Sequence, residues 1–540
     1  MARGAATPRD RTAKPSETIA PCPSAGRPAP DSLRPAISDQ ATSRRLTLVA
    51  CVLGSGIVFL DQTVVNVALP AIRADLDTGL AAQQWVVEAY LLSVGALLLV
   101  GGSLGDLLGR RRVFVAGLIG FGITSLLCAL APSSSMLIAG RALQGIAGAL
   151  LVPASLAIIS AGFPAEQRGA AIGTWTAWTG VAFVIGPLAG GALVDFASWR
   201  LIFAINVPLV LVNLALMRWV PRDPATGSLR DVDVTGALLC ALALAGPVFA
   251  LIEQPTKGWS SPLVWIPLVG GAAMAVGFVA WEARAARPML PLGLFRARNF
   301  AVGNGATLAI YGGLGVVTFL VTIHLQQVAG WSAIAAGLSL LPITIVMWLL
   351  SGRFGRLADR FGPRVFMGVG PVVAGTGMLW MARAGADVDY WTQLLPGVLV
   401  FGFGLAATVA PLTSTVLGAV DPSRAGVASG ANNAISRVAA LLAIAAVGAV
   451  VSARFSDGLD AGTRSLDLSA GERSAVAELR SRPLAGGAPD APRLDPAVRA
   501  ASVDAYRWGV STGGALVVLG GLVALAGIAN PPRRRAAASP

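Results

Sequence analysis

The sequence of 540 residues is too apolar for a soluble protein, since 55% of it is hydrophobic and only 13% is charged, against about a quarter charged in soluble domains. Its mean hydropathy of +0.69 and its many long apolar runs exclude a soluble enzyme and a protein with a single membrane anchor. The net charge of +13 comes mainly from arginines between these runs, which is typical of membrane proteins and differs from a nucleic-acid footprint. We therefore predict an all-α polytopic membrane protein that has the lipid bilayer, and no nucleic acid, as its partner.

The first segment, residues 1–45, is rich in Pro, Ser, Ala and Arg and has no apolar core. This composition is typical of a disordered tail and differs from both a signal peptide and a folded domain. The four cysteines show neither a disulfide framework nor metal-ligand spacing. We expect a disordered cytoplasmic tail and no bound metal.

Fourteen apolar runs of membrane-spanning length follow the tail. They lie near 46–69, 84–104, 113–131, 136–160, 168–192, 200–220, 234–252, 262–282, 301–325, 334–352, 365–383, 393–412, 425–450 and 508–530. An even number of spans places both termini on the same side of the membrane.

The arginines between the runs predict which side that is. Short segments on the side of the termini hold nineteen arginines, whereas short segments on the other side hold only Arg73, Arg200, Lys257 and Arg383. Positive residues accumulate on the cytoplasmic side of membrane proteins. We therefore expect a multi-pass protein of the bacterial cytoplasmic membrane with both termini in the cytoplasm.

An internal repeat divides the chain into halves. The segment GSLGDLLGRRR (102–112) follows the second run, and the similar segment GRFGRLADRFGPR (352–364) follows the tenth. Such duplication predicts two related bundles with a binding cavity at their interface near the mid-plane. The predicted parts are the tail 1–45, a six-helix bundle 46–220, two linker helices with their loops 221–300, a second six-helix bundle 301–530 and a cytoplasmic tail 531–540. The second bundle includes an extracytoplasmic loop, 454–507, in which ERSAVAELRSR predicts a short amphipathic surface helix.

Three charged residues within the apolar runs are candidates for proton coupling. Asp61 ends the first run in LDQTVVNVALP, where a carboxylate is costly in lipid and suits reversible proton binding; the alternative is a hydrated Asp that only stabilises packing. Glu88, in QWVVEAYLL, could hold a lipophilic cation beside Trp85 and Tyr90, or lie near the outer interface. Arg141, in RALQGIAGA, needs an acidic partner, for which Asp61 or Glu88 is the natural candidate.

Glycines and aromatic residues suggest a gate, a flexible helix and a cavity. The gate is predicted from Gly102, Asp106, Gly109, Arg110 and Arg111, with Asp106 pairing with Arg110. A bendable helix is predicted from GVAFVIGPLAGG, with Gly186, Pro187, Gly190 and Gly191. The cavity-lining candidates are Gln144, Trp175, Trp178, Phe183, Tyr311 and Phe319. We expect His324 to be a packed or solvated ring, and Trp199, Trp259 and Trp331 to lie at the membrane interface.

These motifs together resemble the major facilitator superfamily, and in particular its fourteen-helix drug:proton antiporters. LDQTVVNVALP looks like the first-helix signature, GSLGDLLGRRR the loop-two motif, RALQGIAGA the fourth-helix arginine motif and GPLAGG the antiporter motif; SWRLIFAINVP (198–208) is similar to the entry of the sixth helix. The resemblance implies a six-plus-two-plus-six arrangement of helices and alternating access driven by proton influx. Asp61 would then be the first-helix acid, Arg141 the proton-relay arginine, Asp106 with Arg110 the gate and Gly186-Pro187 the kink.

The sequence departs from this family pattern at a few positions. Leu107 replaces the usual basic residue of the gate, and Ala182 stands where glycine is frequent. In the thirteenth run, Ala439 and Ala440 also stand where glycine is frequent, whereas Asn433 and Arg437 are kept. These departures leave the predicted proton acid in place and put the gating details in doubt.

The predicted function is proton-coupled efflux of hydrophobic, in particular cationic, drugs or toxic compounds. The alternative is a dedicated exporter of an endogenous metabolite or antibiotic, which the sequence does not separate from the first. A membrane-embedded enzyme is disfavoured, because the chain has one histidine and no clustered metal-binding acids. We expect a monomer without a cofactor, for which the proton gradient is the energy source.

Overall fold

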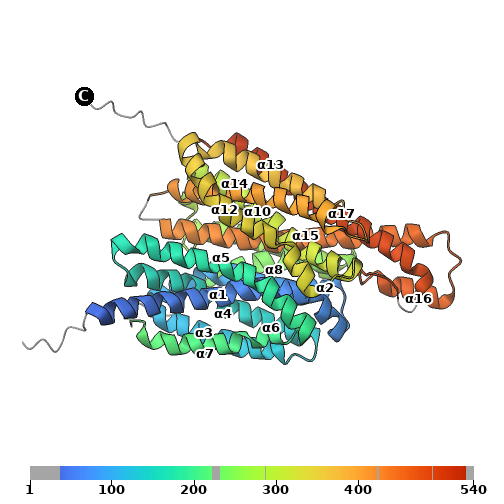
Figure 1. Ribbon diagram of the computed structural model, residues 1–540, viewed down its shortest axis with the longest axis horizontal. Helices are drawn as coiled ribbons and strands as arrows, with labels where there is room; N and C mark the ends of the chain where they lie inside the picture. Colours follow the sequence, from blue (N-terminus) through green and yellow to red (C-terminus); the bar gives the residue numbers. More distant parts are fainter. Residues whose placement is uncertain (1–36, 222–231, 286–287, 422–424, 489–490, 531–540) are drawn as a thin grey trace, which may run out of the picture. The chain divides into compact units, whose positions relative to one another are not determined.

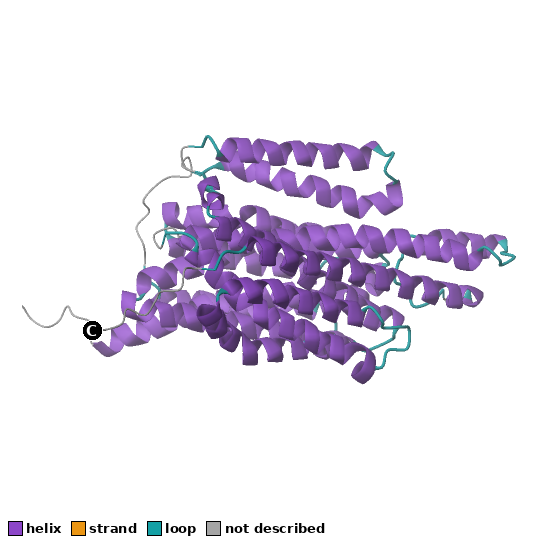
Figure 2. Cartoon of the chain, turned by 90° about the horizontal axis from the view of Figure 1, so that it is seen from above, coloured by secondary structure: helices purple, strands orange, loops and turns teal. Residues whose placement is uncertain are grey.

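The computed structural model describes residues 37–221, 232–285, 288–421, 425–488 and 491–530, with some side chains inside these ranges, including those of Asp106 and Phe183, left undescribed. In these ranges the chain forms helices and loops without a strand (Figure 1, Figure 2). By their contacts, residues 43–540 form one unit and residues 1–42 another. The all-α prediction is therefore confirmed.

The first half of the chain forms six membrane helices, the sixth of which is built from three shorter pieces. They are α1 (Ile37–Leu76), α2 (Leu80–Leu108), α3 (Arg110–Ala129), α4 (Ser134–Gly162), α5 (Ala165–Phe196) and the sixth, made of α6 (Leu201–Ala204), α7 (Asn206–Leu216) and η1 (Met217–Trp219). α4 packs against α2 and α3, and α3 packs against α7. The tail prediction for 1–45 was too long, because α1 already begins at Ile37; a helix formed by the apolar run can extend into the polar residues before it, since Gln and Arg are good helix formers. The rest of the tail, 1–36, lies outside the described residues.

Two further helices, α8 (Val234–Lys257) and α9 (Pro262–Glu282), link the halves in sequence. α8 packs against α2, α15 and α9. α9 exposes large apolar side chains such as Trp265 and Val276. An apolar helix with so little cover is suited to contact with lipid rather than with water.

The second half forms the remaining membrane helices, and in Figure 1 most of them lie across the molecule from α1, α3, α4 and α7. The elements are η3 (Leu292–Arg296), α10 (Arg298–Ile323), the π-helix η4 (His324–Val328), α11 (Ala333–Ser339), α12 (Leu341–Phe361), α13 (Pro363–Met381), the π-helix η5 (Tyr390–Leu394), α14 (Leu395–Gly418), α15 (Ala425–Thr463), α16 (Ala470–Leu479), η7 (Pro492–Leu494) and α17 (Asp495–Gly527). α13 packs against α14 and α17, and α10 packs against α15 and α17.

All fourteen predicted runs correspond to helices. Thirteen helices in the described residues are long and apolar enough to cross a membrane. The remaining run is α5, which has 32 residues and whose fully described apolar part is Ile185–Phe196. The division into two six-helix bundles and a linker pair remains a prediction.

Part of the stretch 454–507, predicted as an extracytoplasmic loop, is helical, because the helices on both sides extend into it. α15 continues to Thr463 and α17 starts at Asp495, so 464–494 lies between them. The reason is close packing: Gly458 lies against Ala501 and Gly462 against Ala497, which lets both helices continue past the apolar runs.

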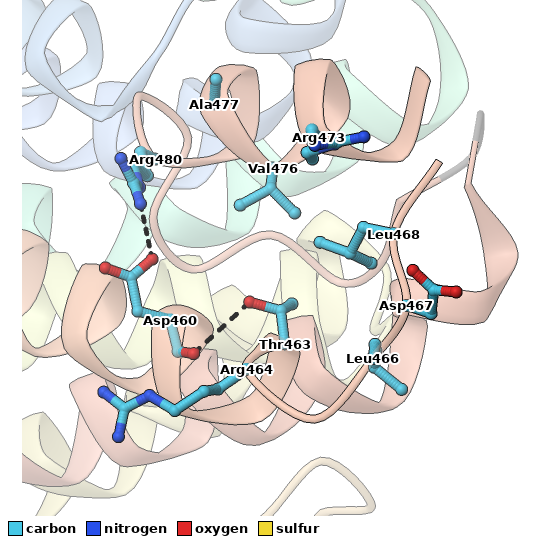
Figure 3. Close-up of a pocket in the computed structure, with 10 residues that line it drawn as sticks. All are labelled: Asp460, Thr463, Arg464, Leu466, Asp467, Leu468, Arg473, Val476, Ala477 and Arg480. Atoms are coloured by element: carbon cyan, nitrogen blue, oxygen red, sulfur yellow. Dashed lines mark hydrogen bonds and ion pairs between the residues drawn. The ribbon is translucent and has the colours of Figure 1, made fainter. Parts of the chain in front are cut away.

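Within this segment, the predicted short amphipathic helix is confirmed as α16. A capping box starts it: Glu472 N donates to Ser469 Oγ, while Ser469 N donates to the Glu472 carboxylate, 2.8 Å away. That backbone hydrogen bond lowers the pKa of Glu472 below its ordinary value of 4.5. A pocket of about 540 Å³ separates α16 from the end of α15, closed on one side by the Arg480–Asp460 ion pair at 2.7 Å (Figure 3).

The two repeat segments have the same backbone conformation at their central glycine. Gly109 has φ = 97° between α2 and α3, and Gly362 has φ = 92° between α12 and α13. Each ends one helix and begins the next, and this region of φ is readily adopted only by glycine. The internal repeat is therefore a repeat of structure, with Gly109 and Gly362 at equivalent positions.

Candidate functional site

A buried ion pair connects α1 with α4. Asp61 has 0% and Arg141 1% of its side chain exposed, and Arg141 Nη1 contacts Asp61 Oδ2. The residues are 80 positions apart in the sequence. Of the two acids predicted as partners for Arg141, the structure pairs it with Asp61.

Neutral side chains from two more helices complete the shell around Asp61. Gln144 Nε2 and Asn206 Nδ2 each donate to Asp61 Oδ1 at 3.0 Å, and Gln144 also donates to Ser125 Oγ at 2.8 Å. Gln144 was predicted to line the substrate cavity, but it belongs to this network. Asn206 and Ser125 were not predicted as site residues; the signal for Asn206 was an amide in the largely apolar run that follows SWRLIF, a run that also holds Asn213.

Arg141 is held on all sides. Its Nε donates to Val86 O at 3.0 Å and its Nη1 to Gln144 Oε1 at 2.7 Å. Its guanidinium carbon lies 4.2 Å from the centre of the Tyr90 ring, a distance suited to a cation–π interaction. Such a pair, fully hydrogen-bonded, can be buried without a large loss of stability, whereas removing one partner typically costs about 3–5 kcal/mol.

Chemically, this arrangement can respond to a proton. A proton on Asp61 removes the charge that holds Arg141, while Gln144 and Asn206 can still hydrogen-bond the neutral acid. Among the described residues, no group of three or more His, Cys, Asp or Glu side chains could hold a metal ion.

Glu88 is completely buried in α2, with 0% exposed. Neither carboxylate oxygen has a hydrogen-bond partner among the described residues. One turn earlier, Gln84 Nε2 donates to Ile444 O on α15 at 3.2 Å, so this face of α2 is directed at α15. The depth of Glu88 in the membrane stays a prediction.

The aromatic residues predicted to accompany Glu88 have other partners. Trp85 Nε1 donates to Glu253 on α8 at 3.3 Å, and its ring packs against Phe249. Tyr90 lies against Arg141 and donates to Val58 O at 3.1 Å. Trp85 and Glu88 are three residues apart on α2, so their side chains point in directions that differ by about 60° around the helix axis. This difference is enough for Trp85 to contact a different helix from Glu88.

The predicted gate is only partly described. Gly109 takes the conformation that requires glycine, Arg110 Nη1 donates to Ala157 O on α4 at 3.3 Å, and Arg111 is half-buried. The side chain of Asp106 lies outside the described residues. Gly102 was expected to permit close helix approach, but Gly101 does so: a Cβ there would overlap Ala149 O.

The glycines of the predicted flexible helix form close helix contacts. A Cβ at Gly186 would overlap Thr63, and one at Gly190 would lie against Val64, both on α1; one at Gly191 would overlap Ile334 on α11. α5 runs as one helix through Pro187. These glycines therefore pack α5 against both halves, and bending at Pro187 remains a prediction.

The remaining cavity candidates have different surroundings. Trp175 is buried and donates to Ser55 Oγ at 3.1 Å, Trp178 is 57% exposed, Tyr311 is half-buried and Phe319 belongs to the hydrophobic core. Phe183 has no described side chain. Their role in a cavity stays a prediction.

Trp199 and His324 are both packed inside the protein. Trp199 is 4% exposed, because its Nε1 donates to Asp75 at 3.1 Å and its ring packs edge-on against Phe203. His324 is buried, stacks on Tyr506 with 3.9 Å between ring centres and hydrogen-bonds to Gly385 O at 2.8 Å. His324 is therefore the packed ring that was one of two expectations, and the position of Trp199 at the membrane interface stays a prediction.

Several polar contacts between the halves lie at one end, which we call the predicted outer end because the arginine distribution predicts it to be extracytoplasmic. Gln326 Nε2 donates to Val67 O at 3.0 Å, and Arg73 Nη1 contacts Gln327 Oε1. The Asp195 carboxylate, at the end of α5, accepts the first two backbone N–H groups of α11 at 2.9 and 2.8 Å. An anion at a helix N-terminus is favourable, so this contact ties α5 to the other half.

Comparisons with known proteins agree with these features. Residues 51–444 match the family model described as Major Facilitator Superfamily. The chain is 36% identical to the puromycin resistance protein pur8 of Streptomyces alboniger over 75% of this chain and 81% of that protein. It is 34% identical to the multidrug resistance protein Stp of Mycobacterium tuberculosis over 77% of each chain. In structure, it is similar to a bacterial homologue of the human lysosomal transporter Spinster in an inward-facing, unoccupied conformation, with a TM-score of 0.60, 18% identity and coverage of 90% of this chain and 97% of that one. This last likeness bears on the fold alone.

Proposed function

Since the chain belongs to the Major Facilitator Superfamily, we propose that it exports hydrophobic, cationic compounds across the cytoplasmic membrane in exchange for protons. Membership makes the protein a multi-pass membrane transporter and not an enzyme. The relatives are named for resistance to puromycin and to multiple drugs, which supports transport out of the cell.

The observation that carries proton coupling is the buried Asp61–Arg141 pair. An acid with no exposed surface, paired with one arginine from another helix, is a two-state element in the sense that coupling needs. With Asp61 ionised, α1 and α4 are held together by the ion pair. With Asp61 protonated, Arg141 loses its counter-charge and the contact between the helices weakens.

The contacts at the predicted outer end support an inward-facing state. Asp195 and the two glutamines of η4 join the halves there. With both termini in the cytoplasm, as the arginine count predicts, substrate would enter from the cytoplasm. Outward opening would then require release of Asp195 from α11.

The driving force for export depends on how many protons are exchanged for each substrate molecule. Exchange of one proton for one monovalent cation moves no net charge, so only the pH gradient drives it. A second proton would add about 2.3 kcal/mol per 100 mV of membrane potential. Glu88 is the candidate for this second proton, because it is buried and its oxygens make no hydrogen bond that protonation would break among the described residues.

Inverted membrane vesicles test the proposal directly. A pH gradient is imposed, and movement of a lipophilic cationic dye is followed for wild type and Asp61→Asn. We expect gradient-dependent dye movement in wild type and none in Asp61→Asn. Asp457→Asn, which changes an exposed aspartate at the outer end of α15, is the matched control and should transport like wild type.

Two outcomes would contradict the proposal. Dye movement in Asp61→Asn that still follows the pH gradient would remove Asp61 from proton coupling. Wild-type protein that is folded and inserted, yet moves no cationic dye, would exclude a broad exporter of cations and favour a dedicated substrate.

A further inference from the structure

A second arginine, Arg437 on α15, is buried inside the membrane region without an acidic partner. It is 7% exposed. Its Nη1 donates to Gln62 Oε1 on α1 over a long 3.4 Å, and its guanidinium carbon lies 5.4 Å from the centre of the Phe59 ring. No carboxylate of the described residues lies within ion-pair distance of it. Arg437 thus differs from Arg141, whose charge is balanced by Asp61.

Such a charge is expensive unless something compensates it. An intramembrane arginine normally pairs with an acid or faces a water-filled cavity. The guanidinium has five N–H donors, and among the described residues Arg437 donates one of them to the neutral amide of Gln62. The other donors are suited to a partner that carries acceptor oxygens.

Arg437 lies at the end of a polar stripe that runs from the predicted cytoplasmic side. Ser429, Asn433 and Arg437 follow one another at intervals of four, so they share one face of α15. Along this stripe Ser429 is half-buried and Asn433 exposed, while Arg437 is buried. On α1, one turn towards the predicted cytoplasmic end from Phe59, a Cβ at Gly56 would meet no atom within 4 Å.

The walls near Arg437 are aromatic. Phe59 packs edge-on against Trp175 of α5, with 6.4 Å between ring centres. A guanidinium next to the Phe59 ring and an amide is suited to a flat apolar molecule that carries an anionic oxygen. It repels a cation.

We propose that Arg437, with Gln62 and Phe59, forms a substrate subsite that binds the carboxylate of amphipathic aromatic compounds entering from the cytoplasm. Arg437 is a specificity-determining residue, because it selects the head group while the aromatic residues bind the ring. The proposal rests on the export function above and extends its substrate range from cations to carboxylates.

This extension has a consequence for the driving force. Exchange of one proton for one monovalent anion moves two positive charges inward, whereas exchange for one cation moves none. Export of a carboxylate therefore depends on the membrane potential, and export of a monovalent cation with one proton does not.

Binding to the purified wild-type protein in lipid nanodiscs tests the subsite without any gradient. The probes are pyrenebutyrate, pyrenebutanol and the corresponding trimethylammonium compound, which share one ring system and differ in the head group. A charge-assisted hydrogen bond supports about a tenfold preference for pyrenebutyrate over the alcohol. Arg437→Gln should abolish this preference, and Arg437→Lys should keep part of it. Arg454→Gln, which alters an arginine that stacks on Trp508 further along the same helix, should leave the preference unchanged.

The comparison of carboxylate and alcohol binding to the wild type needs no variant, so it tests the subsite even where a variant does not fold. Wild type that binds the carboxylate no better than the alcohol overturns the proposal. An equal loss for all three probes in Arg437→Gln also overturns it, because it would give Arg437 a structural role. Failure of the vesicle assay with the carboxylate preference intact would contradict proton-coupled cation export and leave the subsite standing.

Discussion

A double-mutant cycle on Asp61 and Arg141 tests the central ion pair in the greatest detail. Asp61→Asn leaves Arg141 buried with 1% exposure and no carboxylate. Arg141→Gln leaves the Asp61 carboxylate with the amide donors of Gln144 and Asn206 alone. Asp61→Asn keeps the shape of its side chain, whereas Arg141→Gln also shortens it, and each removes one charge, so one uncompensated buried charge remains.

The magnitude follows from that remaining charge. Breaking a buried pair from one side costs about 3–5 kcal/mol, and we expect the loss to be larger in Asp61→Asn, because Arg141 keeps only Gln144, Val86 and the Tyr90 ring as partners. The double variant has no buried charge and can form a neutral amide pair. Its loss should therefore be smaller than that of either single variant, which is a favourable coupling of a few kcal/mol.

The assay is thermal unfolding in one detergent, with the fraction of monodisperse protein measured after heating, for wild type, both single variants and the double variant. We expect the order wild type, double, Arg141→Gln, Asp61→Asn from most to least stable. Transport should be absent from all three variants, since the double variant restores packing without restoring a titratable group. Additive losses in stability would refute the reasoning, because they would mean that the two residues do not interact.

Three further predictions concern the ends of helices. Asp195→Asn removes the negative charge at the start of α11, whose interaction with the helix N-terminus is typically worth about 0.3–1 kcal/mol. A cysteine placed at the predicted outer end should then react faster with an impermeant thiol reagent, and unchanged labelling would exclude Asp195 from holding that end closed. Gly109→Ala and Gly362→Ala each force a side chain into positive φ at about 1–2 kcal/mol, so both should lower the unfolding temperature by similar amounts, and a loss at one position alone would argue against their structural equivalence. The hydrogen bond from Ser469 N lowers the pKa of Glu472. The stabilisation that ionised Glu472 gives α16 is therefore fully present above the ordinary pKa of a glutamate and is lost as the pH falls through the lowered pKa. Amide exchange in α16 should accelerate on acidification, and Glu472→Gln should remove most of this pH dependence.

Much of this protein can be read from the sequence because the membrane imposes a simple rule. Spans must be apolar and helical, so fourteen runs could be found by counting, and the few charges inside them, Asp61, Glu88 and Arg141, were conspicuous. The glycine repeat was visible for a similar reason, since only glycine readily adopts the turn that Gly109 and Gly362 share. Helix ends were less predictable, because α15 and α17 extend beyond the membrane wherever packing against each other favours it.

The tertiary structure decided which residues meet. A sequence shows which residues lie on one helix, but it does not show how that helix is rotated about its axis or which helix is its neighbour. For this reason the sequence could not decide whether Arg141 pairs with Asp61 or with Glu88, and the structure shows the pair with Asp61. Likewise, Asn206 reaches the site from a largely apolar run whose amides gave no sign of which carboxylate they would meet. The same rotation turned Trp85 away from Glu88 and left Arg437 beside Phe59 without an acid. Apolar composition determines that a segment spans the bilayer, and the packing of small and large side chains between helices determines what its rare polar residues contact.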